Sequence, residues 1–391
     1  MRIGFTTSVP VEVIFAAGHT PIDLNNIFVL NNPVSHVRKA ELSGFPRNIC
    51  AWIKGMYSVI TQNEIDLIIG VIQGDCSNTH SLMSILQDEG KKVLPFSYPY
   101  HQHIIEDSIH ASRQNRDKDI LEKEIASLEK YFNVTREETQ HVKEKLDNIR
   151  KKLILLDNLT WQTNQVTASE NHLWLVTSSD FNSDYEKYEK ELDEFLEIAM
   201  KRNSKLTLCH PEHIYCHPEH IYYHPEHIYC HPERSEGSPR CFVPQHDKID
   251  TPDSQLPTPN SQLNLGYIGV PPILEDIYEY IEECQAKVVF NEVQRQFSMP
   301  YLETDIIDQY HRFTYPKDIF CRIKDIKLAI TERKIDGLIA YTQSFCHRQL
   351  DLISLKKHID IPILQIEGDQ PGKIDSRTKL RIESFIEMLR Q

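Results

Sequence analysis

The sequence predicts an α/β protein with two similar parallel-sheet units, a helical segment between them and a disordered repeat insertion. Three observations predict this class. Strand-like and helix-like segments alternate near both ends of the chain, which is typical of parallel sheets covered by helices. Amphipathic helical patterns fill the middle of the chain. A short repeated motif then separates the middle from the C-terminal unit.

The N-terminal unit begins with a short apolar run at residues 2–6, which we interpret as a strand. A helix is expected to follow from Pro10 to Gly18, because proline favours a helix start and glycine a helix end. Residues 65–72, IDLIIGVI, form a continuous apolar run, which indicates a strand buried on both faces. Residues 93–96 form a further expected strand.

The middle of the chain, residues 118–203, is expected to be mostly helical. Thr135 and Glu138 match a capping box, and an apolar stripe with spacings of three and four follows it. Ser183 and Glu186 match a second cap. These stripes indicate packing faces rather than cofactor sites.

Alternation returns near the C-terminus. The expected strands are 265–270, 287–290, 335–342 and 361–366, and the expected helices are 272–284 and 377–389. The chain is thus divided into an N-terminal α/β domain (1–117), a helical segment (118–208), a low-complexity repeat insertion (209–263) and a C-terminal α/β domain (264–391).

The composition excludes some classes of partner. The 391 residues carry a formal net charge of −14, which argues against nucleic acid, because phosphate binding needs a basic field. No apolar run approaches the length of about 20 residues that spans a bilayer, so no membrane partner is expected. Pro10 and Glu12 make the N-terminus a poor signal peptide. We therefore expect a cytoplasmic protein, in which cysteines serve as thiols, metal ligands or catalytic groups.

The insertion has an unusual composition. It begins CHPEHIY, CHPEHIY, YHPEHIY, and residues 209–262 hold four of the nine cysteines and eight of the nineteen histidines. A proline in every unit excludes a heptad coiled coil. One interpretation is a Cys/His tract that binds zinc or copper. We favour a low-complexity insertion without a core, because the regular spacing is not that of a typical tetrahedral site.

Two segments match each other without a gap, at an offset of 270 residues. IDLIIGVIQGDC, which ends at Cys76, matches IDGLIAYTQSFC, which ends at Cys346. Each cysteine follows a buried strand, at the place where open α/β sheets bind ligands. The alternative is a buried thiol that packs as a small hydrophobe. The polar surroundings in GDCSN and SFCHR make that alternative less favourable.

A third cysteine, Cys50 in PRNICAWIKG, lies at or near a predicted helix start, where the helix N-terminus stabilises a thiolate. Cys50, Cys76 and Cys346 can together hold three irons of a cubane cluster and leave the fourth open to a substrate oxygen. Residue types alone leave this as one interpretation among others, because cubane clusters more often show close cysteine spacings. We interpret Cys284 and Cys321 as packing residues.

Further motifs occur in order along the chain. They are TTSVPVEVIFAAGHTPIDL, LDNIRKKLILLDNL, GVPPILEDIYEYIEECQAKVVFNE, IDGLIAYTQSFCHRQLDL, IPILQIEGDQ and RTKLRIESFIEML. Together they resemble the 2-hydroxyacyl-CoA dehydratase D-component family, which includes benzoyl-CoA reductase subunits and double-cubane-cluster proteins. The first motif resembles the family's PxE(L/I)xxAAG start. The likeness covers nearly the whole chain except the insertion.

The resemblance implies two flavodoxin- or Rossmann-like α/β domains with added helices. It implies a [4Fe-4S] cluster, and the positions that match its three ligands are Cys50, Cys76 and Cys346. It also implies a dimer with a homologous second subunit and a separate ATP-dependent iron–sulfur activator, in an anaerobic system. The chain has no GxxxxGK[ST] loop of its own, which agrees with a separate ATP-hydrolysing partner.

The implied activity is that of a 2-hydroxyacyl-CoA dehydratase, a lyase, or of a benzoyl-CoA reductase-like enzyme. A low-potential electron would form a ketyl radical on an acyl-CoA thioester. The alternative is a non-catalytic iron–sulfur electron-transfer or scaffold subunit. The sequence leaves the acid and base unknown. Glu12, Asp75 and His347 lie near the expected loops, but we favour capping or solvated roles for them.

Overall fold

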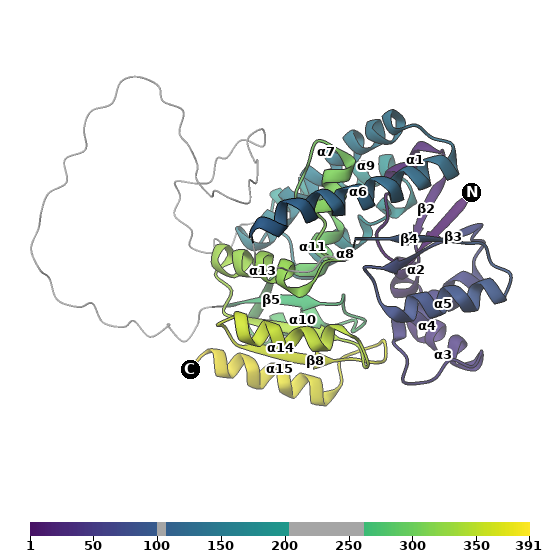
Figure 1. Ribbon diagram of the computed structural model, residues 1–391. Helices are drawn as coiled ribbons and strands as arrows, with labels where there is room; N and C mark the ends of the chain where they lie inside the picture. Colours follow the sequence, from purple (N-terminus) through teal and green to yellow (C-terminus); the bar gives the residue numbers. More distant parts are fainter. Residues whose placement is uncertain (100–106, 203–261) are drawn as a thin grey trace, which may run out of the picture. The chain divides into compact units, whose positions relative to one another are not determined.

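Two four-stranded parallel sheets organise the structure, a computed structural model that describes residues 1–99, 107–202 and 262–391 (Figure 1). The strands of the first sheet are β1 (Arg2–Phe5), β2 (Thr20–Asp23), β3 (Leu67–Gln73) and β4 (Val93–Ser97). Those of the second are β5 (Leu263–Gly269), β6 (Ala286–Asn291), β7 (Gly337–Thr342) and β8 (Ile363–Glu367). The spatial orders are β2-β1-β3-β4 and β6-β5-β7-β8. The two sheets therefore share one topology, and the predicted α/β fold is confirmed.

Helices lie between and around the strands. The N-terminal half contains α1 (Val11–Ala16), α2 (Leu24–Leu30), α3 (Pro33–Leu42), α4 (Ala51–Gln62) and α5 (Ser77–Asp88). The middle contains α6 (Asp107–Phe132), α7 (Arg136–Trp161), α8 (Ala168–Thr177), the 3-10 helix η1 (Phe181–Ser183) and α9 (Tyr185–Met200). The C-terminal half contains α10 (Ile277–Glu283), α11 (Glu292–Phe297), α12 (Ile306–Arg312), α13 (Ile319–Arg333), α14 (Arg348–His358) and α15 (Ser376–Leu389).

The helix ends show where local signals worked and where they failed. The capping box of Thr135 and Glu138 is confirmed, with both reciprocal hydrogen bonds present. The cap predicted at Ser183 is wrong by one residue, because the carboxylate of Asp184 accepts the N–H of Lys187. The helix predicted from residue 272 begins only at Ile277. The backbone before it instead pairs with Gly372.

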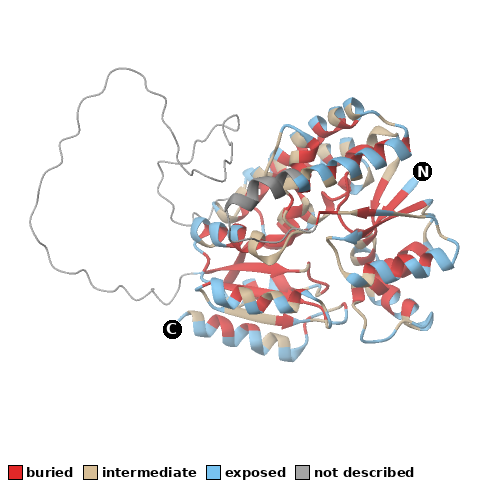
Figure 2. Ribbon diagram, in the orientation of Figure 1, coloured by how far each residue is buried: buried red, intermediate tan, exposed pale blue. Residues whose placement is uncertain are grey.

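Both faces of each sheet are covered, which explains the continuous apolar runs of the strands. In β3, Leu67, Ile69 and Val71 pack with α1, α6, α7 and α9, whereas Ile68 packs with α2 to α5. In the second sheet, one face packs with α10 and α15 and the other with α13 and α14. In Figure 2 the strands are mostly coloured as buried, whereas buried and exposed residues alternate along the helices.

A buried ion pair joins α7 to the N-terminal half. The guanidinium Nη2 of Arg150 donates to Glu12 Oε1 at 2.7 Å, and both side chains are buried. The second carboxylate oxygen of Glu12 accepts the hydroxyl of Tyr310 at 2.8 Å. Since Tyr310 lies on α12, this group connects three parts of the chain. Glu12 is therefore neither solvated nor a simple cap, contrary to the interpretation from sequence.

A second buried pair joins α7 to the C-terminal half. Asp157 accepts two hydrogen bonds from the guanidinium of Arg333 on α13, at 2.6 and 3.1 Å. Arg333 and the nearby Arg295 hold the pKa of Asp157 below its usual value, despite the opposing effect of burial. Arg150 and Asp157 are seven residues apart, so they lie on the same face of α7. One helix face thus pairs with both halves.

Two further expectations concern the repeat insertion and membrane-spanning helices. The predicted repeat insertion, 209–263, lies outside the described residues except for its last two positions. Within the described ranges, no helix combines the length and the apolar character needed to cross a bilayer.

Glu12→Leu should lower the free energy of unfolding by about 3–5 kcal/mol, because it leaves Arg150 buried without its main partner. Denaturant unfolding measures this change. The double variant Glu12→Leu/Arg150→Met should recover part of the loss, since it removes both charges. Glu191→Ala is the control, because the Glu191–Lys187 pair is exposed and spans 3.7 Å; it should cost less than about 1 kcal/mol. Equal losses for Glu12→Leu and Glu191→Ala would contradict the assigned role.

Two buried carboxylates at the end of β2 should make stability depend on pH. The N–H of Asp23 donates to Asp180 Oδ2 at 2.7 Å. Burial, and then the charge of Asp23, raise the pKa of Asp180 to about 7. The folded state therefore binds more protons than the unfolded state between about pH 4 and 7, so the free energy of unfolding falls as the pH rises through this window.

Asp180→Asn should reduce this fall, as measured by denaturant unfolding at several pH values. Asp184→Asn is a matched control, because Asp184 is exposed and asparagine caps a helix equally well. Identical pH profiles for wild type and Asp180→Asn would argue against the carboxylate pair as the cause.

Candidate functional site

Cys76 and Cys346 occupy equivalent places in the two halves. Cys76 follows β3 by three residues and is the N-cap of α5, while Cys346 follows β7 by four and lies just before α14. In both sheets this third strand lies beside the first, at the point where the strand order reverses. Ligands of open α/β sheets bind outside the carboxyl ends of the strands at this point.

Cys50 comes from a different kind of position. It is the N-cap of α4, the helix that precedes β3, and its side chain makes no capping hydrogen bond. The structure brings its segment to that of Cys346, since the N–H of Ala51 donates to Gln343 Oε1 at 3.2 Å. Burial raises the pKa of Cys50 most, and the charges of Cys346 and Cys76 add to this effect. The charge of Cys346 likewise raises the pKa of Cys76. Three loops that are far apart in the sequence therefore meet.

Burial decides the electrostatics of these thiols. It is the largest cause of the raised pKa of Cys76 and of Cys346. Burial also raises the pKa of Cys50 to about 12, although the N–H groups of Trp52 and Ile53 oppose the shift. The helix N-terminus was expected to stabilise a Cys50 thiolate. Its effect is present, but the loss of solvation is larger.

Polar and aromatic side chains surround the Cys76 and Cys346 loops. The guanidinium of Arg348 lies 4.5 Å from the ring centre of Tyr315 and donates to the Tyr315 carbonyl oxygen at 3.0 Å. Thr79 donates its hydroxyl to Asp75 at 3.1 Å. Burial raises the pKa of Asp75 to about 6, while the charge of Arg348 and a hydrogen bond with Tyr315 act in the opposite direction. Gly74, beside Cys76, packs against Pro316, and Arg348, beside Cys346, packs against Tyr315, so the segment of Tyr315 and Pro316 contacts both loops.

The three acid–base candidates differ in their burial and contacts. Glu12 forms a buried ion pair with Arg150. Asp75 is half-buried beside Cys76, whereas His347 is exposed at the start of α14. Sequence reasoning missed Arg348 and Tyr315. Arg348 stands two residues after Cys346 and could have been considered, but nothing near Tyr315 in the sequence connects it to a cysteine.

The donor set fits an iron–sulfur cluster. Cys50, Cys76 and Cys346 are free thiols. Among the residues that the structure describes, no three His, Cys, Asp or Glu side chains are arranged around one metal ion. A cubane cluster has a different requirement, because each cysteine binds its own iron. Three soft sulfur donors suit a cationic iron centre, which would favour their ionised form.

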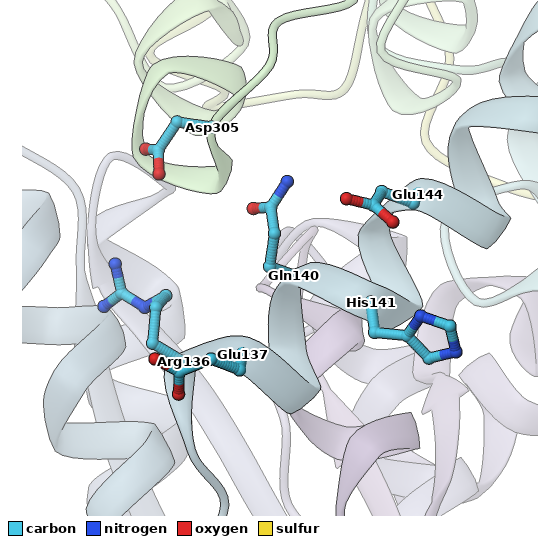
Figure 3. Close-up of a pocket in the computed structure, with 6 residues that line it drawn as sticks. All are labelled: Arg136, Glu137, Gln140, His141, Glu144 and Asp305. Carbon is cyan, nitrogen blue, oxygen red and sulfur yellow. The ribbon is translucent and has the colours of Figure 1, made fainter.

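The other two cysteines lie elsewhere in the fold. Cys284 is the C-cap of α10 and packs against an apolar cluster. Cys321 lies in the first turn of α13, the helix that precedes β7. The surface depression of about 350 Å³ in Figure 3 lies along the start of α7. Its lining side chains, which include Arg136, Gln140 and Asp305, contain none of the candidate residues.

Comparison with known proteins identifies the chain's relatives. The family model described as 2-hydroxyglutaryl-CoA dehydratase, D-component, matches residues 6–214 and 241–389. The match includes the three cysteines discussed above and every strand of the two sheets except β1, which ends at Phe5. It omits residues 215–240, which belong to the predicted repeat insertion. No curated protein matches the chain significantly.

Gly74, in the loop before Cys76, is packed too closely to accept a larger residue. Its φ is +94°, and a Cβ atom there would lie 2.7 Å from Cβ of Pro316 and 2.8 Å from Cβ of Tyr98. Gly74→Ala should destabilise the fold through both backbone strain and overpacking, by about 2–5 kcal/mol together. Denaturant unfolding gives the loss.

Gly90→Ala is the control for strain alone. Gly90 also has a positive φ, of +78°, but a Cβ there would meet nothing within 4 Å. It should therefore cost about 1–2 kcal/mol. A Gly74→Ala loss no larger than that of Gly90→Ala would show that the contact with Pro316 is unimportant.

Proposed function

The chain belongs to the 2-hydroxyglutaryl-CoA dehydratase D-component family, and from this premise we propose that it is the iron–sulfur subunit of a 2-hydroxyacyl-CoA dehydratase. Membership in the family makes it a dehydratase-type enzyme component. The finer proposal is that Cys50, Cys76 and Cys346 hold a [4Fe-4S] cluster. Its main support is the hydrogen bond between Ala51 and Gln343, which joins the segments of Cys50 and Cys346 from two halves that the family model matches together.

The protein's own residues have separable tasks in this proposal. The three thiols bind iron, and the loops carry them at the carboxyl ends of β3 and β7 and at the start of α4. Arg348 provides a buried positive charge beside Cys346, which reduces the repulsion among sulfur ligands. When bound, the cluster would supply a low-potential electron to an acyl-CoA thioester and an open iron to act as a Lewis acid.

The partners follow from the same premise. We propose a homologous second subunit, which forms the dimer, and an ATP-dependent iron–sulfur activator that delivers the electron. The sequence supports a separate activator, since Gly368 to Lys373 is one residue short of a phosphate loop and lacks the Ser or Thr that follows the lysine. A reductase that passes the electron to an aromatic ring would use the same cysteines, so the substrate has to be tested directly.

Iron analysis tests the cluster. Protein reconstituted without oxygen should contain about four irons and four sulfides per chain, because a cubane has that composition. Cys76→Ser and Cys346→Ser should lose most of this iron. Cys321→Ser is the matched control and should keep its iron, since Cys321 lies in the first turn of the helix before β7 and Cys50 is the N-cap of the helix before β3. Full iron in Cys76→Ser, or zinc that disappears only when residues 209–262 are deleted, would contradict the proposal.

Turnover tests the enzyme. The loaded dimer should convert a 2-hydroxyacyl-CoA ester when activator, ATP and a reductant are present. Reduction of an aromatic acyl-CoA instead would identify the reductase branch. A loaded protein that exchanges electrons with the activator but converts no ester in a broad panel would indicate an electron-transfer subunit.

A further inference from the structure

A completely buried glutamine connects two of the three cysteine loops. Gln343 directly follows β7, lies three residues before Cys346 and has a relative exposure of 0%. Its side-chain Oε1 accepts the backbone N–H of Ala51 at 3.2 Å. Ala51 is the first residue of α4 and directly follows Cys50. One side chain of the C-terminal half is therefore bonded to the backbone next to a cysteine of the N-terminal half.

The other groups of Gln343 fix its orientation. Its Nε2 donates to the hydroxyl of Tyr341 at 2.9 Å, and that hydroxyl donates to the carbonyl oxygen of Gly368 at 3.3 Å. Because the N–H of Ala51 needs an acceptor, Oε1 must face it and Nε2 must face Tyr341. The backbone oxygen of Gln343 accepts the N–H of Cys346 at 3.1 Å. The residue thus holds the Cys346 loop and the start of α4 in one arrangement.

The hydrogen bond to Ala51 satisfies the first N–H group of α4. The first N–H groups of a helix have no partner within the helix, and an N-cap side chain usually accepts one of them. Cys50 is the N-cap of α4 but makes no such bond. In α5, by contrast, Cys76 Sγ accepts the N–H of Asn78 at 3.4 Å. Ala51 carries the first N–H group of α4, which an N-cap side chain does not usually accept, so Gln343 gives this group its acceptor.

The matching residue of the first half has a different role. Gln73 corresponds to Gln343 at the offset of 270, three residues before Cys76. Its side chain is exposed and donates to the carbonyl oxygen of Tyr98, within its own half, at 2.9 Å. The two glutamines occupy equivalent strand ends. Of the two, Gln343 is buried and bonded to the other half.

We propose that Gln343 is a positioning residue that sets the distance and orientation between Cys50 and Cys346 as cluster ligands. The inference rests on the proposed iron–sulfur function. Residues that orient metal ligands commonly change metal affinity by about 10–100-fold when they are replaced. Gln343 acts through backbone groups next to two ligands, so its loss should loosen the cluster rather than prevent folding.

Gln343→Met tests the proposal, because methionine keeps the approximate size and shape and removes both hydrogen bonds. Iron release to a chelator from the anaerobically loaded protein should be about tenfold faster or more than from wild type. The electron paramagnetic resonance spectrum of the reduced protein should also change. Gln73→Met is the matched control and should retain both wild-type properties. Wild-type release and spectrum in Gln343→Met would overturn the proposal.

A general loss of stability has to be separated from a positioning effect. Gly90→Ala strains the chain at the end of α5, where an added Cβ meets nothing within 4 Å. It should leave the rate of iron release near that of wild type. Equal acceleration in Gly90→Ala and Gln343→Met would assign Gln343 a merely structural role. If the wild-type protein holds no iron, the proposed iron–sulfur function itself is wrong. A fault in this inference alone would leave iron in the wild-type protein.

Ala51→Pro removes the other partner of the same hydrogen bond. Proline is tolerated at the first position of a helix, and Cys50 already has the extended backbone, ψ 132°, that a residue before proline adopts. Ala51→Pro should accelerate iron release as Gln343→Met does, and the double variant should release iron no faster than the faster single variant. Additive effects would mean that the two residues act independently, which contradicts the proposal.

Discussion

The two buried ion pairs of α7 are the constraint on which the arrangement of the cysteine loops depends. Arg150 pairs with Glu12 in the N-terminal half, and Asp157 pairs with Arg333 in the C-terminal half. A buried charge that loses its partner is costly, so each pair opposes a separation of its half from α7. Through these pairs, α7 is attached to both halves that carry the cysteine loops. It contributes none of the cysteines, yet it limits how the two sheets can carry them.

The shared topology of the two sheets explains part of the site and leaves part unexplained. Equivalent strand ends give equivalent places to Cys76 and Cys346, so one structural rule accounts for two of the three cysteines. Cys50 has no such counterpart, because the corresponding helix of the second half, α13, is capped by Asp318. The asymmetry continues in the glutamines. Gln343 crosses to α4, whereas Gln73 stays within its own half. The two similar units thus differ at these equivalent positions.

Sequence reasoning succeeded where the signal was local. The apolar runs of β3 and β7 and the capping box of Thr135 depend on neighbouring residues, and all three were found. It failed at β2, whose residues TPID carry too short an apolar pattern. The burial of Glu12 depends on Arg150 and Tyr310, which are 138 and 298 residues away. Such partners leave no periodic signal. For the same reason Tyr315 was missed, and the balance of burial against helix N–H groups at Cys50 could not be judged.

The unequal distribution of cysteine and histidine has a consistent explanation in the family match. The match continues on both sides of residues 215–240 and omits them, so the sequence pattern of the family does not require the repeat. The repeat occurs between α9 and β5, a connection between elements of the two halves. Closing a longer connection costs only about 0.6 kcal/mol for each doubling of its length, so the fold can accept additional residues there. The three cysteines of the candidate site all lie in matched segments, in loops that end strands or begin helices of the fold. Their chemistry can therefore be understood from that fold, independently of the many cysteines and histidines in the repeat.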